Sequence, residues 1–321
     1  MKLISCFFVL CLSVTLLGQD FSIEYKTFLL QPHFKSRHIK SLTIKKSSDS
    51  LFNKSSIKYK LQFDTEGRLT KLYDYYFDTD TIPERLIEYT YGDSSMYYSG
   101  KTYFYLDENR KILLEKGWSM EFDNVNNVIE EKFHNKLDLY RTNTLIFNKS
   151  MQVLSRKVRA FAIKLETYFK YNADGMIRHV KMVKHNPTVE KMKRLELNQY
   201  LQYNLHQKIM TTEQWLDERG KQINEYFYNY KGQNISARVG WRLMNWSNDE
   251  KKLIERTNFF YDQYGLLIGS NYFTERQVSN IHKYEKFEYT FYSEDGKVNR
   301  TSDRFTTIWY TDLFAENLIH P

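Results

Sequence analysis

The side chains that could do chemistry do not form any of the common catalytic motifs. The chain has no Gly-x-Ser-x-Gly elbow, no His-Glu-x-x-His pair, no phosphate-binding glycine loop and no dinucleotide fingerprint. His33 and His38 would lie on opposite faces of a strand, and His179 and His185 would share a face about 20 Å apart. We therefore expect no metal site, no cofactor and no enzymatic activity. Two distant carboxylates could still meet in the fold and cleave glycosides, so that alternative stays open.

Two aromatic stretches are candidates for a binding surface. The first, residues 240–246, combines tryptophan with arginine, a pairing that suits stacking on sugars or contact with a protein. We expect it to be a long insertion between hairpins. The second, residues 94–100, has no acidic residue. The competing interpretation is that these rings cover the sheet as part of the core. The candidate binding residues are Trp241, Arg242, Trp246, Tyr97 and Tyr98.

The elements that must position these residues are short hairpins. In Phe260–Ile268 an aromatic ends one extended run, Asp262-x-x-Gly265 turns the chain, and an aliphatic opens the next run. An Asp or Asn side chain caps such a turn, and Gly adopts the left-handed conformation at its end, which gives a hairpin loop with a bulge. The predicted turn residues are Asp64, Gly67, Asn172, Gly175, Asn229, Gly232, Asp262, Gly265 and Gly296.

The spacing and polarity of these units predict the fold class. From Phe122 to Tyr292 the aromatic recurs every 24 to 33 residues, which fits two strands and two turns. Between turns the residues alternate: in Lys164–Tyr171 one face is Leu165, Thr167, Phe169 and Tyr171, and the other is charged. Alternation with period two is typical of an antiparallel sheet that is wet on one side. The chain is thus predicted to be all-β: an antiparallel meander of successive β-hairpins in a long curved or partly closed sheet, with a possible short C-terminal helix.

The amino terminus has the pattern of a secretory signal peptide. A basic start precedes the apolar run Leu3–Leu17, and we expect cleavage after Gly18. Cys6 and Cys11 are the only cysteines and both lie in this segment, so the mature chain can form no disulfide. The expected organisation is a signal peptide at 1–18, N-terminal strands of the same sheet at 19–60, the hairpin-repeat sheet at 61–301, and a C-terminal strand or short helix at 302–321. Within that last segment, 312–319 is the expected helix.

The amino-acid composition indicates which classes of binding partner to expect. The formal charge is +8, but the basic residues are spread between acids, so we expect no nucleic-acid binding. The 26 Tyr and 22 Phe suit strands, and only 4 Pro and 12 Gly argue against disorder. The apolar run at the amino terminus is too short to span a membrane comfortably, and no transmembrane segment is expected in the mature chain. The partner is unknown; a glycan, a lipid or an envelope protein would each fit.

The hairpin unit resembles a known repeat. Phe63-Asp64-x-x-Gly67-x-Leu69 and its copies resemble the YD (RHS-type) repeat of bacterial secreted and surface proteins, over roughly Leu61 to Val298. The resemblance implies hairpin architecture and an envelope setting. It implies no activity, because the self-cleaving core motif and the toxin domain of that family's polymorphic toxins are not found. Asp49-Ser50-Leu51 and Asp80-Thr81-Ile82 also resemble short O-glycan acceptor motifs of Bacteroidetes envelope proteins.

These patterns favour an exported, non-enzymatic scaffold or binding surface in the periplasm or at the cell surface. The alternative is a periplasmic carrier of lipid or lipoprotein, whose aromatic face would form the concave side of a half-barrel-like sheet. A third possibility, a barrel in the outer membrane, is disfavoured because the polar face of the strands is heavily charged.

Overall fold

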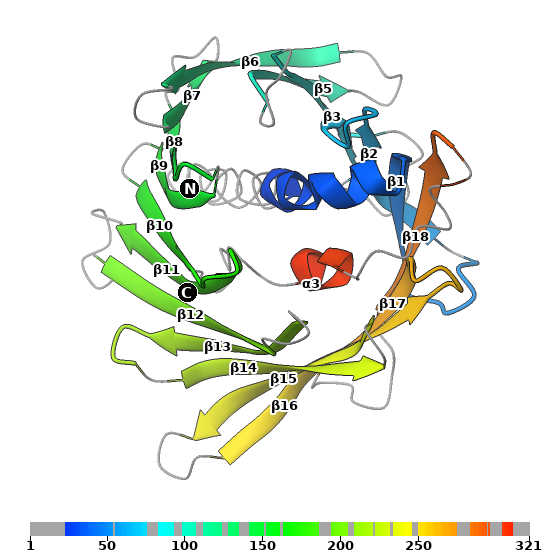
Figure 1. The fold of residues 1–321 in the computed structure, drawn as a ribbon, viewed down its shortest axis with the longest axis vertical. Coiled ribbons are helices and arrows are strands. Elements are labelled where there is room, and N and C mark those ends of the chain that lie inside the picture. The colour runs from blue at the N-terminus through cyan, green and yellow to red at the C-terminus, as the bar shows by residue number, and fades with distance from the viewer. Residues whose placement is uncertain are drawn as a thin grey trace, which may run out of the picture.

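The computed structural model forms one large antiparallel sheet with helical segments inside it (Figure 1). It describes residues 23–53, 55–75, 83–92, 98–106, 112–123, 128–134, 141–150, 152–160, 163–185, 194–204, 209–220, 222–231, 234–245, 250–274, 283–293, 295 and 304–310. The first nine strands are β1 Ile39–Ser47, β2 Ser55–Phe63, β3 Leu69–Asp74, β4 Arg85–Thr90, β5 Gly100–Leu106, β6 Ile112–Asp123, β7 Val128–His134, β8 Arg141–Phe147 and β9 Val153–Ala160. The other nine are β10 Ile163–Tyr171, β11 Ile177–His185, β12 Arg194–Asn204, β13 Ile209–Asp217, β14 Gln222–Lys231, β15 Asn234–Asn245, β16 Glu250–Tyr261, β17 Leu267–Thr274 and β18 Lys283–Phe291.

The sheet is closed into a ring. Strands adjacent in sequence pair antiparallel from β1 to β18, and β1 also pairs with β18 through Leu42 opposite Tyr289 and Ile44 opposite Phe287. Each described strand therefore has two hydrogen-bonded neighbours. The predicted fold class is confirmed, and the curvature goes as far as closure, because a twisted sheet of this many strands does not stay open and flat.

The polarity alternation sorts side chains between the inside and the outside of the ring. In β10, Thr167 and Phe169 are buried on the inside, while Lys164 and Glu166 form an ion pair outside. Pairs of opposite charge cross between strands on the outer face: Lys71–Glu88, Lys181–Glu196 and Lys45–Glu288, at 2.6 to 2.8 Å. The outer face is therefore a charged surface wherever these strands are described.

The short turns have the geometry expected of a capped turn with a bulge. At Asp64 the carboxylate accepts bonds from the backbone amides of Glu66 and Arg68, and the Gly67 amide donates to the Asp64 carbonyl. The backbone φ is 75° at Gly67, 76° at Gly175 and 77° at Gly265. Asn172 and Asp262 cap their turns in the same way. Gly232 and Gly296 lie outside the described residues. Asn229 lies within strand β14 opposite Ala237, so its predicted place in the turn is wrong; the strand pairing continues two residues further than the pattern indicated. We call the end of the ring that carries these turns the short-turn end.

Tyrosines near the strand ends, some of them the aromatic residue of the repeat, make bonds that the spacing of the repeat did not predict. At the short-turn end, a tyrosine hydroxyl donates to the backbone carbonyl of the first or second residue of the neighbouring strand, where no turn joins the two strands. Five such bonds measure 2.8 to 3.0 Å: Tyr91 to Leu69, Tyr171 to Val153, Tyr203 to Ile177, Tyr261 to Ile235 and Tyr289 to Leu267. Tyr230 bonds the carbonyl of Met210 likewise. These tyrosine staples join β4, β10, β12, β14, β16 and β18 each to the strand before it.

Helical segments fill the ring near its short-turn end. Their presence corrects the expectation that residues 19–60 form only strands. Residues 23–36 form a helix, although strands were expected throughout 19–60; strands do begin at Ile39. A second helix, α3, spans Arg304–Tyr310. The expected helix at 312–319 lies outside the described residues, and so does the expected signal peptide. Both helices lie inside the ring (Figure 1).

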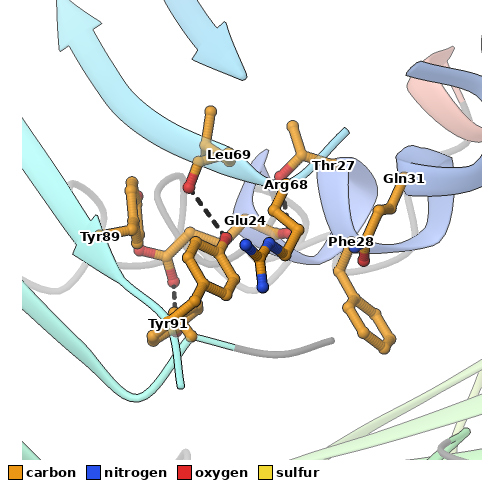
Figure 2. A pocket seen from close by; sticks show the side chains of 9 residues that line it. Glu24, Thr27, Phe28, Gln31, Arg68, Leu69, Tyr89 and Tyr91 are labelled. Atoms are coloured by element: carbon orange, nitrogen blue, oxygen red, sulfur yellow. Dashed lines mark hydrogen bonds between the residues drawn. The ribbon is translucent and has the colours of Figure 1, made fainter. Parts of the chain in front are cut away.

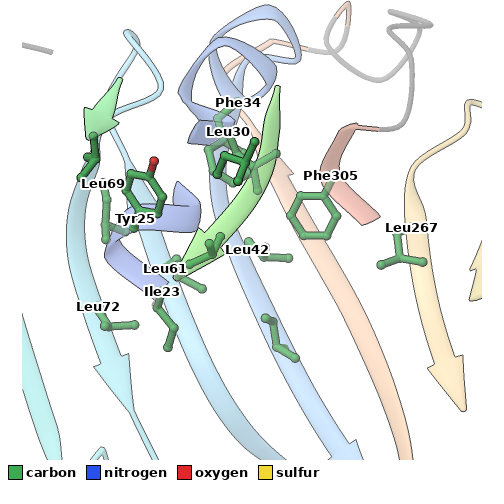
Figure 3. Packing of buried hydrophobic residues seen from close by; sticks show 14 of the residues in the cluster. Ile23, Tyr25, Leu30, Phe34, Leu42, Leu61, Leu69, Leu72, Leu267 and Phe305 are labelled. Carbon is green, nitrogen blue, oxygen red and sulfur yellow. The ribbon is translucent and has the colours of Figure 1, made fainter. Parts of the chain in front are cut away.

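The core lies between these helices and the aromatic inner face of the sheet. Tyr25, Leu30 and Phe34 of the helix 23–36 are buried against the ring, together with Phe305 of α3 (Figure 3). Phe34 stacks on Phe63 of β2 with ring centroids 4.1 Å apart. Hairpins alone are marginal in water, so this shared core is what makes the ring stable.

Candidate functional site

The pocket most clearly formed lies between the helix 23–36 and strands β3 to β5, near the short-turn end (Figure 2). Its lining residues are Glu24, Thr27, Phe28, Gln31, Arg68, Leu69, Tyr89, Tyr91 and Tyr98. The pocket has room for about one water molecule. It can therefore hold a water or the tip of a side chain, and not a whole metabolite.

A buried carboxylate forms the floor of this pocket. Glu24 is 3% exposed and accepts hydroxyl bonds of 2.9 Å from both Tyr89 and Tyr98. The ammonium of Lys101 lies 3.0 Å from the same carboxylate and 5.1 Å from the centre of the Tyr98 ring. All the polar atoms in this cluster are used in mutual bonds. The arrangement fixes the helix against the sheet.

An arginine and a tyrosine form the outer wall of the pocket. The Arg68 guanidinium lies 4.8 Å from the centre of the Tyr91 ring, and its Nε donates to Asp64 at 2.7 Å. Burial raises the pKa of the Tyr91 hydroxyl, which donates to the Leu69 carbonyl. Tyr91 is therefore a neutral hydrogen-bond donor at physiological pH.

A second group of charged residues lies on the inner face further from the short-turn end. We call it the inner polar belt, and its residues are Lys58, Asp74, Arg85, Glu213, Arg238, Glu255, Tyr272 and Glu285. Asp74 and Arg85 lie at the ends of β3 and β4 away from the short-turn end, and the other six lie within their strands. Asp74 and Arg85 pair across β3 and β4, with side chains 15% and 6% exposed.

The best-connected part of the belt is centred on Glu213. This fully buried carboxylate accepts bonds from Gln199, Trp215 and Tyr228 at 2.7 to 2.8 Å, and from Arg238 at 3.3 Å. Arg238 also donates to Glu255 at 2.8 Å, and Glu255 accepts a bond from Tyr272. The charge of the arginine is thus shared by two carboxylates.

A glycine makes room for this network. The Arg238 guanidinium lies 3.6 Å from the centre of the Tyr226 ring. A Cβ on Gly240 would lie 2.6 Å from that ring, so only glycine lets Tyr226 stack there. The stacking and the two carboxylates together hold Arg238 in one position.

The belt continues to α3. Tyr310 of α3 donates to Glu285 at 2.9 Å and its oxygen lies 2.8 Å from the Ser270 hydroxyl, which donates to it, and Lys58 lies 2.9 Å from Glu285. Burial opposes ionisation of Glu285, yet Lys58 and Tyr310 hold its pKa below the usual value. The carboxylate is therefore charged and anchors the second helix.

Of the residues selected from the sequence, the structure describes the side chains of Tyr98, next to β5, and Trp241, in β15. Tyr98 is buried and bonded to Glu24, so its place in an exposed surface is wrong. Trp241 is half-buried in β15, and residues 240–245 belong to that strand instead of an insertion. Trp246 and Tyr97 lie outside the described residues, and so does the side chain of Arg242.

Four functional candidates were not predicted from the sequence: Glu24, Lys101, Glu213 and Arg238. A signal for Glu213 was present, because it falls in phase with Trp215 and thus on the aromatic face of β13. A charge in that phase points inward and needs a buried partner. The partner, Arg238, is 25 residues away in the chain and was not identifiable from local pattern.

Within the described residues no group of three or more potential metal ligands comes together. None of the described helices has the length and apolar character needed to cross a membrane.

The fold and these sites define a closed antiparallel ring whose inner face is packed with its own helices. No family model matches the chain, and no curated protein matches it. Among solved structures, a porin-like protein from Bacteroides uniformis aligns at 8% identity with a TM-score of 0.42, covering 78% of this chain and 96% of the other. A porin-like protein from Bacteroides vulgatus aligns at 9% identity with a TM-score of 0.28, covering 78% and 98%.

Proposed function

We propose that this chain is an exported, non-enzymatic scaffold or binding protein of the bacterial envelope. One observation carries the proposal: the aromatic inner face is covered by the chain's own helices, with Tyr25, Phe34 and Phe305 at most 2% exposed. The strands meanwhile turn charged pairs outward. A ring built this way offers partners its outer face and rims. The signal-peptide pattern supports export to the periplasm or the cell surface.

The absence of catalysis is part of the proposal. Its support is that Glu24, Glu213 and Glu255 each hold an arginine or a lysine, so their charge is already compensated. Kinship with the YD-repeat proteins is also proposed, and the capped turns at Gly67, Gly175 and Gly265 support it.

The first test separates scaffold from carrier. Residues 19–321 are purified from a periplasmic extract without detergent and weighed by native mass spectrometry. We expect the mass of the polypeptide alone. A lipid bound in stoichiometric amount would overturn the scaffold proposal in favour of the carrier.

The second test addresses catalysis. The same protein is screened against chromogenic glycosides and esters, and no turnover above buffer is expected. Turnover that Glu213→Gln abolishes and Glu196→Gln leaves unchanged would establish an enzyme. Glu196 is the matched control because its carboxylate lies on the outer face, paired with Lys181.

A further inference from the structure

The pairing between β1 and β18 differs from all the other strand pairings described. The other ladders join strands that follow one another in the chain. The β1–β18 ladder joins residues 39–47 to residues 284–291. Local hairpins form readily, whereas a contact between distant segments must first overcome the entropy of closing a long loop. This seam is therefore the costliest pairing to form and the easiest one to lose.

Two helices meet behind this seam. Phe305 of α3 lies 6.0 Å from Phe287 and 6.4 Å from Tyr289, both on β18. On its other side it lies 5.9 Å from His33 and 6.2 Å from Phe34, both on the helix 23–36. Phe34 in turn stacks on Phe63 of β2. One line of rings thus runs from β18 to β2 across the inner side of β1.

Polar contacts strengthen the same junction. The Lys26 ammonium donates to the carbonyl of Trp309 at 2.7 Å, which joins the two helices directly. The Thr306 hydroxyl bonds the Tyr261 oxygen, and Tyr310 donates to Glu285 and accepts from the Ser270 hydroxyl, which ties α3 to β16, β17 and β18. Arg37, which follows the first helix, donates to the Tyr264 carbonyl in the turn between β16 and β17.

We propose that the ring opens at the β1–β18 seam, and that the helix 23–36 and α3 together act as a clasp that holds it shut. The clasp comprises Lys26, His33, Phe34, Phe305, Trp309 and Tyr310. Opening at the seam separates β18 from β1 and leaves the hairpins on either side intact. The clasp is the contact that a binding event or a change of conditions must break to open the ring.

The experiment is hydrogen–deuterium exchange of the full chain, compared with Phe305→Ala. We expect amides in Ile39–Ser47 and Lys283–Phe291 to exchange about tenfold faster or more, because the variant loses a buried aromatic that bridges the seam. The matched control is Phe147→Ala, which removes an equally buried aromatic on β8, far from the seam in the ring. Its faster exchange should centre on β8 and β9.

Two further variants keep the test decisive if Phe305→Ala does not fold. Tyr310→Phe removes only the hydroxyl bonds to Ser270 and Glu285 and should speed exchange at the same two strands. A disulfide between Thr43→Cys and Glu288→Cys, which face each other across the seam, should reverse that effect. Uniform acceleration over the whole ring, or earlier opening between any other strand pair, would overturn the proposal.

Discussion

At the scale of single residues, Glu24 and Lys101 form a buried ion pair that stabilises the fold. Both side chains are at most 3% exposed, so neither charge can be left alone without a large cost. Lys101→Met should lower the free energy of unfolding by about 3 to 5 kcal/mol, because it strands a buried carboxylate. Urea unfolding followed by circular dichroism measures this.

The double variant Lys101→Met with Glu24→Gln is the control for that prediction. It removes both charges and keeps much of the volume, so it should recover most of the loss. A double variant less stable than Lys101→Met alone would contradict the assignment of the pair as a compensated buried charge.

The tyrosine staples make a second residue-scale prediction. Tyr203→Phe removes the bond to the Ile177 carbonyl and should cost about 1 kcal/mol, the usual net value of such a bond. Tyr200→Phe serves as the comparison because Tyr200 is 40% exposed on the outer face, and it should change stability by less than about 0.5 kcal/mol. Equal effects of the two substitutions would rule out the staple as a stabilising contact.

His33 gives the stability a defined dependence on pH. Burial, with a smaller contribution from Arg37, lowers the pKa of His33 to about 4 in the folded chain. The unfolded chain therefore takes up the proton first as pH falls, so the contribution of His33 is intact above about 6.5 and is lost between about 6.5 and 4. His33→Gln should flatten the stability curve in that window, as measured by urea midpoints at successive pH values. An unchanged slope in the variant would remove His33 as the cause.

At the scale of elements, the turns and the first helix depend on one another. A Cβ on Gly67 would lie 2.5 Å from the Gln31 carbonyl oxygen and 2.6 Å from the Lys35 backbone nitrogen, both on the helix 23–36. Gly67→Ala should thus both strain a left-handed turn and push the helix away. Gly220 has the same φ of 75°, and a Cβ there would meet nothing within 4 Å. Substitution of Gly220 therefore measures the backbone strain without a clash.

The two substitutions should therefore differ in size. Gly220→Ala should cost about 1 kcal/mol, the usual penalty for a residue with a Cβ in that conformation. Gly67→Ala should cost clearly more in the free energy of unfolding and should speed proteolysis of residues 23–36. Equal costs would show that the turn at Gly67 does not support the helix.

The elements also show which parts of the fold the sequence could reveal. The strands were predictable because alternation and capped turns are local signals, as in Lys164–Tyr171 and at Asp262. The helix 23–36 was not, although Ile23, Leu30 and Phe34 recur at helical spacing and are buried. Pro32 and the strand pattern that follows obscured that signal, and the helix is stabilised by the ring around it. The polar sites depend on partners far apart in the chain, such as Glu24 with Lys101, and no local pattern predicts them.

At the scale of the whole molecule, closure removes the edges that a long sheet would otherwise expose. Each described strand has its backbone groups paired on both sides, so the ring offers no template for adding strands from other molecules. Breaking one central strand of the ring would create two edges at once. The hydrogen bonding of β1 is therefore expected to control the solubility of the molecule as much as its stability.

Thr43→Pro tests this directly. Thr43 lies in the middle of β1, opposite Glu288 on one side and Lys60 on the other, and proline removes a backbone donor from the ladder there. We expect the variant to form oligomers that grow with protein concentration, measured by light scattering, because the freed edges pair between molecules. Thr65→Pro is the comparison: Thr65 is the second residue of the exposed turn Asp64–Gly67, a position that favours proline, so that variant should behave as the wild type does. If Thr43→Pro kept the light scattering of the wild type at all concentrations, closure of the ring would not be what protects the sheet from association.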